Sequence, residues 1–205
     1  MKTDPFLDTC EFLVSGGWPT YLFWLLLLGG SAVAVHMFVI DSRQRTVKDV
    51  WMCIARIIVG GMWWQQTFLK PPLYYTDLPG MQDSGLRHWM TEMVNNASFS
   101  TQAEFVKEIV LPNLSVFAPF VYAVEVFIAT SLILGLFTRV GAALGALMAV
   151  NMWLGLYRAP YEWPWTYFFL IVIQVTFALF DAGRSLGLDA KFAMVTSRDW
   201  GPKDE

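Results

Sequence analysis

Two ionisable residues, Arg56 and Glu125, lie deep within apolar stretches of the sequence. A charge at membrane depth is costly, so by default it marks a functional site with a partner. Arg56 lies about 12 Å along its helix beyond Lys48, and Glu125 lies about 21 Å along its own helix before Arg139. If both reference residues lie on one side of the membrane, the axial gap is about 9 Å, which two long side chains can nearly close. The spacing therefore predicts an Arg56–Glu125 pair inside a helical bundle.

This pair has two interpretations. It can simply lock the bundle, because a pair keeps both residues charged where either alone would be neutralised or reach for the interface. It can also form a binding site, with small and aromatic neighbours at helical spacing. These neighbours are Gly60, Trp63 and Trp64 beyond Arg56, and Tyr122 and Ala129 on either side of Glu125. A quinone suits such a site, with Arg56 donating a hydrogen bond to a quinone oxygen and Glu125 carrying a proton.

The other candidate residues do not form a metal or redox centre by their spacing. His36 is either a haem or chlorophyll ligand or an ordinary imidazole, and one such histidine cannot give bis-histidine ligation. Cys10 and Cys53 have no Cys or His neighbour at metal-ligand spacing. The sequence also lacks a Rossmann glycine fingerprint, a CxxC motif and a P-loop. We therefore expect no metal and no covalent cofactor, and an enzymatic role, which stays open, would need a quinone or a borrowed cofactor.

The composition indicates a membrane protein. Of the 205 residues 56% are hydrophobic and 15% are charged, against about 25% charged in soluble domains. With 14 Lys and Arg against 17 Asp and Glu, the net charge of −3 argues against nucleic-acid binding. The apolar residues form five runs, each close to the length of about 20 residues that spans a bilayer. These runs are residues 18–40, 50–69, 115–137, 140–157 and 163–180. The predicted fold class is an all-α, polytopic membrane helix bundle.

The Lys and Arg residues predict the orientation of the bundle, because cytoplasmic loops are enriched in them. Five spans with the N-terminus outside place more of these residues on the inner side than on the outer side. The inner residues are Arg43, Arg45, Lys48, Arg139, Arg184, Lys191, Arg198 and Lys203. The leader before the first run carries one Lys and several acids, so we expect this run to be a retained helix and not a cleaved signal peptide.

Small residues and amphipathic segments predict further contacts. The outer loop, residues 70–114, contains two short amphipathic stretches that either cover the bundle, lid a site or dock a soluble partner. Gly141, Gly145 and Ala149 form a small-residue stripe that favours close helix packing. Gly29, Gly30 and Ala32 form a similar patch on the first run. Because lipid contact needs no such patch, we expect it to dock another subunit.

From residue 50 onward the sequence resembles the DoxX/DoxD family of four-helix membrane proteins. The segments that carry the resemblance are 55–61 (ARIIVGG), 68–70 (FLK), 105–112 (FVKEIVLP), 122–125 (YAVE), 134–139 (LGLFTR) and 181–189 (DAGRSLGLD). Arg139, Asp181, Arg184 and Asp189 are the charged residues of the motif at the inner end. The resemblance implies a four-helix core over residues 50–190, with both ends inside and a cytoplasmic tail at 191–205. Residues 1–49 depart from the pattern by adding a helix.

The resemblance also implies a link to quinone-dependent redox chemistry, because named family members are subunits of a thiosulfate:quinone oxidoreductase. We therefore expect a multi-pass protein of the bacterial or archaeal cell (inner) membrane that contacts lipid and other subunits. One functional hypothesis is a quinone-linked subunit of an oxidoreductase or electron-transfer complex, with its site near Arg56 and Glu125. The alternative is a non-catalytic accessory or scaffold subunit of a larger respiratory or photosynthetic complex.

Overall fold

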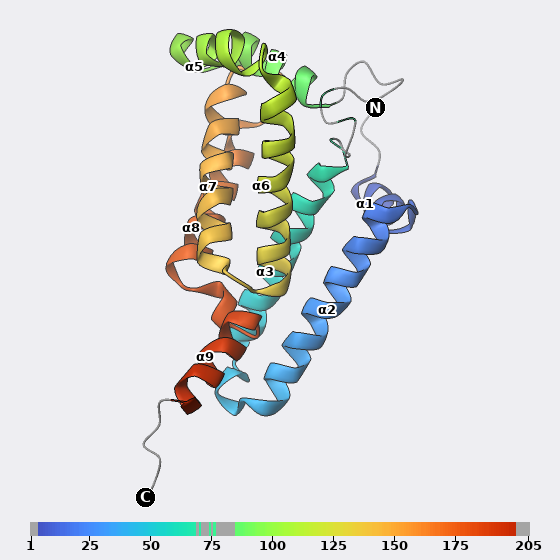
Figure 1. Cartoon of the computed structure of the whole chain (residues 1–205), viewed down its shortest axis with the longest axis vertical. Helices are drawn as coiled ribbons and strands as arrows, with labels where there is room; N and C mark the ends of the chain where they lie inside the picture. Colours follow the sequence, from blue (N-terminus) through green and yellow to red (C-terminus); the bar gives the residue numbers. More distant parts are fainter. Residues whose placement is uncertain (1–3, 69, 71–73, 75, 77–84, 200–205) are drawn as a thin grey trace, which may run out of the picture.

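The computed structural model describes residues 4–68, 70, 74, 76 and 85–199, and within these ranges the regular structure is entirely helical (Figure 1). The four core helices are α3 (Val47–Thr67), α6 (Leu114–Leu134), α7 (Thr138–Gly155) and α8 (Pro164–Leu179). At the N-terminal side, α1 (Pro5–Val14) precedes α2 (Trp18–Ile40). One end of the bundle is called the inner end because the Lys and Arg residues predict that it faces the cytoplasm, and the opposite end is called the outer end. The inner end carries the short helices η1 (Ser42–Gln44), η3 (Ala182–Arg184) and α9 (Leu188–Asp199). Each predicted apolar run is a helix whose ends lie within three residues of the prediction.

The core helices pack in two antiparallel pairs, α3 with α6 and α7 with α8. Their shared interior contains Val59, Trp63, Ile128, Leu132 and Phe177, all nearly inaccessible to solvent. The small-residue stripe of α7 lies inside this bundle. A Cβ on Gly141 would overlap Ser131 of α6, and one on Gly145 would overlap Gln174 of α8. Close approach along α7 therefore holds three of the four helices together.

Two helices, α2 and α6, are long and apolar enough to cross a membrane by length and composition. The apolar helix α8 is shorter, with 16 residues. The other two core helices carry polar residues within their length, Arg56 in α3 and Asn151 in α7, which lowers their mean hydropathy. The chain is thus an all-α protein whose core helices differ in hydropathy.

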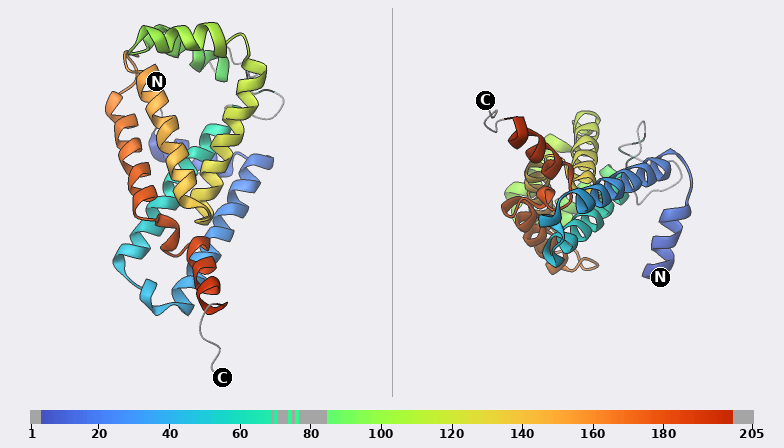
Figure 2. Two further views of the ribbon diagram at one scale, coloured as in Figure 1. Left: turned by 60° about the vertical axis from the view of Figure 1, so that its left-hand side comes forward. Right: turned by 90° about the horizontal axis from the view of Figure 1, so that it is seen from below.

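Helix α2 lies on the outside of the bundle and is inclined to the core helices (Figure 2). A Cβ on Gly30 would lie 2.6 Å from the carbonyl oxygen of Ile133, so this glycine contacts α6. Gly29 faces Leu134 of the same helix, whereas Ala32 is exposed. The two glycines thus make an intramolecular contact, and docking of another subunit at this patch stays a prediction. Because only 17% of the apolar window of α2 is buried, its other face remains open to lipid or another chain.

The outer end of the bundle is covered by α4 (Leu86–Asn96), α5 (Ser100–Phe105) and the π-helical segment η2 (Val106–Val110), which lie across it (Figure 1). Their apolar side packs on the ends of α6 and α7, where Gly155 accommodates the Met93 side chain. The backbone amide of Ser98 donates to the carbonyl of Leu154 at 2.8 Å. Parts of the predicted outer loop (residues 71–73, 75 and 77–84) and the end of the predicted tail (200–205) lie outside the described residues.

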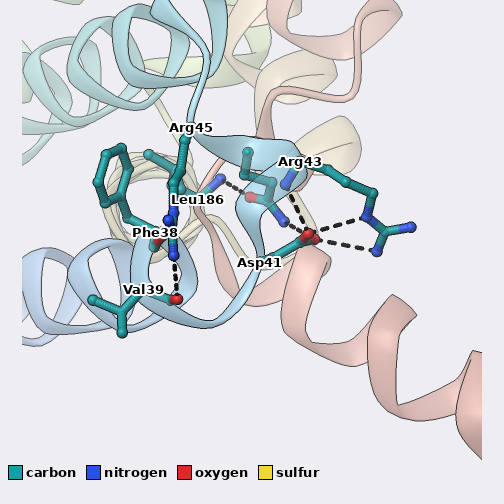
Figure 3. A network of polar contacts seen from close by, with 7 residues as sticks. Phe38, Val39, Asp41, Arg43, Arg45 and Leu186 are labelled. Carbon is teal, nitrogen blue, oxygen red and sulfur yellow. Dashed lines mark hydrogen bonds and ion pairs between the residues drawn. The ribbon is translucent and has the colours of Figure 1, made fainter.

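Arginines cap the C-terminal ends of several helices at the inner end of the molecule. Arg45 donates from Nε to the carbonyl of Phe38 at 2.8 Å and from Nη2 to that of Val39 at 2.7 Å, in the last turn of α2 (Figure 3). Arg139 donates to the carbonyl of Ala178 at 3.2 Å, at the end of α8. A helix leaves its last carbonyls without intrahelical partners, and a cation there also complements the helix dipole.

Candidate functional site: a buried lysine–glutamate pair

Arg56 makes the most buried of these arginine contacts, with its side chain wholly inaccessible to solvent. Its Nη1 donates to the carbonyl oxygens of Leu132 and Ile133, the second at 3.1 Å. These carbonyls are open because α6 ends at Leu134 and Gly135 takes up a left-handed conformation, with φ of 68°. The Nη2 atom lies 3.6 Å from the sulfur of Cys53, one turn earlier on α3. Arg56 therefore fastens α3 to the inner end of α6.

Two glycines allow close packing near Arg56. A Cβ on Gly135 would lie 2.7 Å from Nη1 of Arg56 and 2.7 Å from the Cα of Gly187. A Cβ on Gly60 would lie 2.8 Å from the Ile133 side chain, so Gly60 is a helix contact and not the floor of a pocket. These contacts give Arg56 and Gly60 a role in packing, and their role in ligand binding stays a prediction.

The charged motif residues organise the same inner end. The Asp189 carboxylate accepts hydrogen bonds from the backbone amides of Phe137 at 2.8 Å and Thr138 at 3.0 Å, and so caps the start of α7. The Asp189 amide in turn donates to the carbonyl of Gly135 at 2.8 Å. Asp181 and Arg184 form a more exposed ion pair at 2.9 Å. These contacts give the motif an architectural role.

Glu125 lies near the middle of α6, and its partner is Lys70, which the sequence reasoning did not select. The Lys70 Nζ atom lies 3.0 Å from each Glu125 carboxylate oxygen, and the two residues are 5% and 4% exposed. Lys70 follows the last turn of α3, which ends well short of the outer end of α6 (Figure 1). The predicted Arg56–Glu125 pair is therefore wrong, because each residue is satisfied by a different partner at a different level of α6.

Aromatic residues accompany the Lys70–Glu125 pair along the inward direction. Trp63 and Trp64 share a buried cluster with Ile128 and Ala129, which lie one turn from Glu125 on α6. The Trp64 indole donates to the carbonyl of Pro19 at 3.1 Å, tying α3 to α2. The Trp63 indole nitrogen is buried and has no hydrogen-bond partner among the described residues. Tyr122, at i−3 from Glu125, is half-buried.

A second aromatic group lies where α1, α2 and the end of α3 meet. The ring of Phe12 lies 5.0 Å from that of Phe68 and 5.1 Å from that of Phe23, in edge-to-face geometry. Trp24 donates to the carbonyl of Leu13 at 2.9 Å, which holds the end of α1 against α2. Because Phe68 is two residues from Lys70, this group forms an apolar boundary beside the ion pair.

The Lys70–Glu125 pair can do chemistry that Arg56 cannot. An arginine stays protonated in proteins, whereas lysine and glutamate side chains both change protonation state. Transfer of one proton from Lys70 to Glu125 converts two opposite charges into two neutral groups without moving net charge. A buried pair that shares a proton in this way is suited to deliver or accept a proton beside a bound polar group. Elsewhere in the membrane helices, His36 is exposed on α2.

Comparison with known proteins identifies the family. No curated protein and no solved structure matches the chain, but a model of the DoxX family matches residues 52–158. This match covers just over half of the chain and runs from α3 through the outer helices and α6 to the turn after α7. It includes both the arginine-capped inner turn and the Lys70–Glu125 pair. The chain belongs to the DoxX family, as the resemblance predicted.

Proposed function

We propose that this DoxX-family membrane protein is a subunit of a quinone-linked oxidoreductase or electron-transfer complex. In this proposal a quinone, or a similar lipid-soluble ligand, binds beside Lys70 and Glu125. The observation that carries the proposal is this ion pair, buried just beyond the end of α3. Well-packed apolar residues often replace a buried ion pair without loss of stability. Stability alone therefore does not explain why this pair is present, which favours a functional role.

The residues around the pair are suited to a flat ring with carbonyl groups. Lys70 is the hydrogen-bond donor for one carbonyl oxygen, and Glu125 accepts or returns the proton. The buried Trp63 indole supplies an N–H group with no acceptor among the described residues, and a buried donor without a partner costs about 1 to 3 kcal/mol. A bound quinone supplies two-electron, two-proton chemistry. The electrons would come from another subunit, since this chain has no CxxC motif or haem-attachment pattern of its own.

The test is the amount of quinone that copurifies with the chain in mild detergent, extracted with solvent and quantified per polypeptide. We expect the wild type to retain quinone and Glu125→Gln to lose most of it. The double variant Lys70→Met/Glu125→Leu should lose it as well without leaving a stranded charge. Glu104→Gln changes an exposed carboxylate on α5 and should retain quinone as the wild type does. Wild-type quinone content in the double variant would disprove the proposed site.

The exposed face of α2 favours a second candidate function, that of an accessory subunit. Leu25, Leu28 and Val35 are each more than 60% exposed on this helix. A photo-reactive residue at Leu28 in the native membrane tests this role. Crosslinks to a second polypeptide support it, and crosslinks to lipid alone contradict docking through this face. The two functions are compatible, because a quinone-binding subunit also needs a partner that supplies electrons.

A further inference from the structure

A polar pocket lies at the inner end of the molecule, away from the Lys70–Glu125 pair. Its volume is about 180 Å³, and its walls come from the loop after α2, from η3 and from α9. The lining includes Asp41, Arg43 and Gln44 on the first wall, Arg184 on the second and Ala193 on the third. Neither the proposed quinone site nor the contacts of Arg56 involve this pocket.

Two arginines in the pocket are fixed by carboxylates through one edge of each guanidinium. Arg43 donates to Asp41 from Nε at 3.0 Å and from Nη2 at 3.3 Å (Figure 3), and Arg184 donates from Nε to Asp181 at 2.9 Å. Their side chains are 83% and 68% exposed, so the other N–H groups are accessible. Asp41 also accepts from Gln44 at 3.2 Å, so its carboxylate is already satisfied. Two guanidinium groups oriented in this way suit a phosphate group.

The position of the pocket indicates where the phosphate would come from. Asp41 directly follows Phe38, Val39 and Ile40, which form the exposed apolar end of α2. On the opposite wall, Phe192 of α9 exposes 57% of its surface beside Ala193. The pocket thus begins where an apolar, bilayer-length helix ends, which is the level of lipid headgroups. A free anion would make no contact with these apolar flanks, whereas the acyl chains of a lipid would pack against them.

We propose that this pocket binds the phosphate-bearing headgroup of an anionic phospholipid, held between Arg43 and Arg184, with acyl chains along the exposed end of α2. Basic pockets at the cytoplasmic ends of transmembrane helices bind such headgroups. The site would be a specific lipid site, distinct from general attraction of the basic inner surface to an anionic leaflet.

The experiment measures binding of phosphatidylglycerol to delipidated full-length protein in neutral detergent, by native mass spectrometry and by the shift in thermal midpoint. Arg184→Gln should weaken binding about tenfold. Its control, Lys191→Gln, removes one exposed charge from the same face without touching the pocket. Ala193→Phe should weaken binding by filling the pocket with no change in charge. Its control, Thr196→Phe, adds the same ring elsewhere on α9. Arg43 is left unchanged, because its loss would strand the buried Asp41 carboxylate, whereas Asp181, the partner of Arg184, is more exposed.

Each outcome supports or overturns the proposal. Selective loss in Arg184→Gln and Ala193→Phe, with both controls like the wild type and weak binding of phosphatidylcholine, supports it. Equal loss in Lys191→Gln would show that surface charge alone is responsible. Equal stabilisation by inorganic phosphate or glycerol phosphate would show a free-anion site and overturn the lipid assignment. Unchanged binding in both pocket variants would place the lipid elsewhere.

Discussion

The inner and outer halves of the bundle each bury a charge, but they satisfy it in different ways. At the inner end, backbone carbonyls of α6 surround Arg56, and glycines close the space around it. Further outward, Lys70 balances Glu125 at the end of a helix that stops half-way along its neighbour. The first arrangement has no alternative protonation state, whereas the second has one. The contrast separates a residue that builds the fold from a pair that is available for chemistry.

The largest expected effect tests which end of the bundle faces the outside of the cell. Cys10 is exposed near the outer end, and Cys53 is buried near the inner end. In intact cells a membrane-impermeant maleimide should label Cys10 and leave Cys53 unlabelled, which is an all-or-none contrast scored by mass shift. Cys10→Ser is the control and should abolish labelling. Labelling of Cys10 only after permeabilisation would reverse the predicted orientation.

The next effect in size is the loss of the Arg56 contacts. Arg56→Met leaves two buried carbonyls at the end of α6 without donors, and each charge-assisted hydrogen bond contributes about 1.5 to 3 kcal/mol. We expect little folded protein, measured as the monodisperse fraction on size exclusion. Arg45→Met is the matched control, because Arg45 also caps two carbonyls but is exposed. Similar losses in both variants would show that burial of Arg56 is unimportant.

A mutant cycle on the outer pair should give a smaller and reversible effect. Glu125→Leu and Lys70→Met each leave one buried charge without its partner, and each should cost about 3 kcal/mol. Lys70→Met/Glu125→Leu should recover most of that stability, because no unpaired charge remains. Thermal midpoints in detergent measure both changes. If the double variant loses the sum of the two single losses, the residues are not coupled. Rescue here, with no comparable rescue for Arg56, would sharpen the contrast between the two halves.

The smallest expected effect is the pH response of the inner surface. The hydrogen bond from Arg43 lowers the pKa of Asp41 from its ordinary value of 3.8. A lowered pKa in the folded state means that the stabilisation is present above pH 3.8 and is lost as the pH falls through the folded-state pKa. The thermal midpoint of the wild type should therefore fall more steeply below about pH 4 than that of Asp41→Asn. Parallel curves would show that this contact adds nothing measurable.

The helices could be predicted from the sequence because an apolar run of bilayer length has few alternatives to a helix. The short amphipathic α1 was not predicted, since its acidic residues interrupt the apolar pattern. Arg56 and Glu125 are buried, as their place in apolar runs predicts, but neither has the predicted partner. A signal for Arg56 existed, because Gly135 after an apolar helix predicts a left-handed C-cap with open carbonyls nearby. That signal places a cation at the end of α6 instead of beside Glu125.

Lys70 was missed for a different reason. Lys70 follows an apolar run and precedes two prolines, so the predicted topology places it at the start of the outer loop and not in the bundle. Its burial depends on how far α6 extends beyond the end of α3. A long segment separates these two helices, so their relative heights are not encoded by a short turn. The pairing arises from tertiary packing, which local patterns do not contain.

The arginine caps at the inner end have a consequence for membrane insertion. Arg45 and Arg139 belong to the charge bias that predicts the orientation of the chain, and the same side chains complete the ends of α2 and α8. Moving them to the opposite loops would remove the orientation signal and the helix caps together. A substitution that moves one of these arginines in order to invert the chain would therefore also destabilise the helix that the arginine caps.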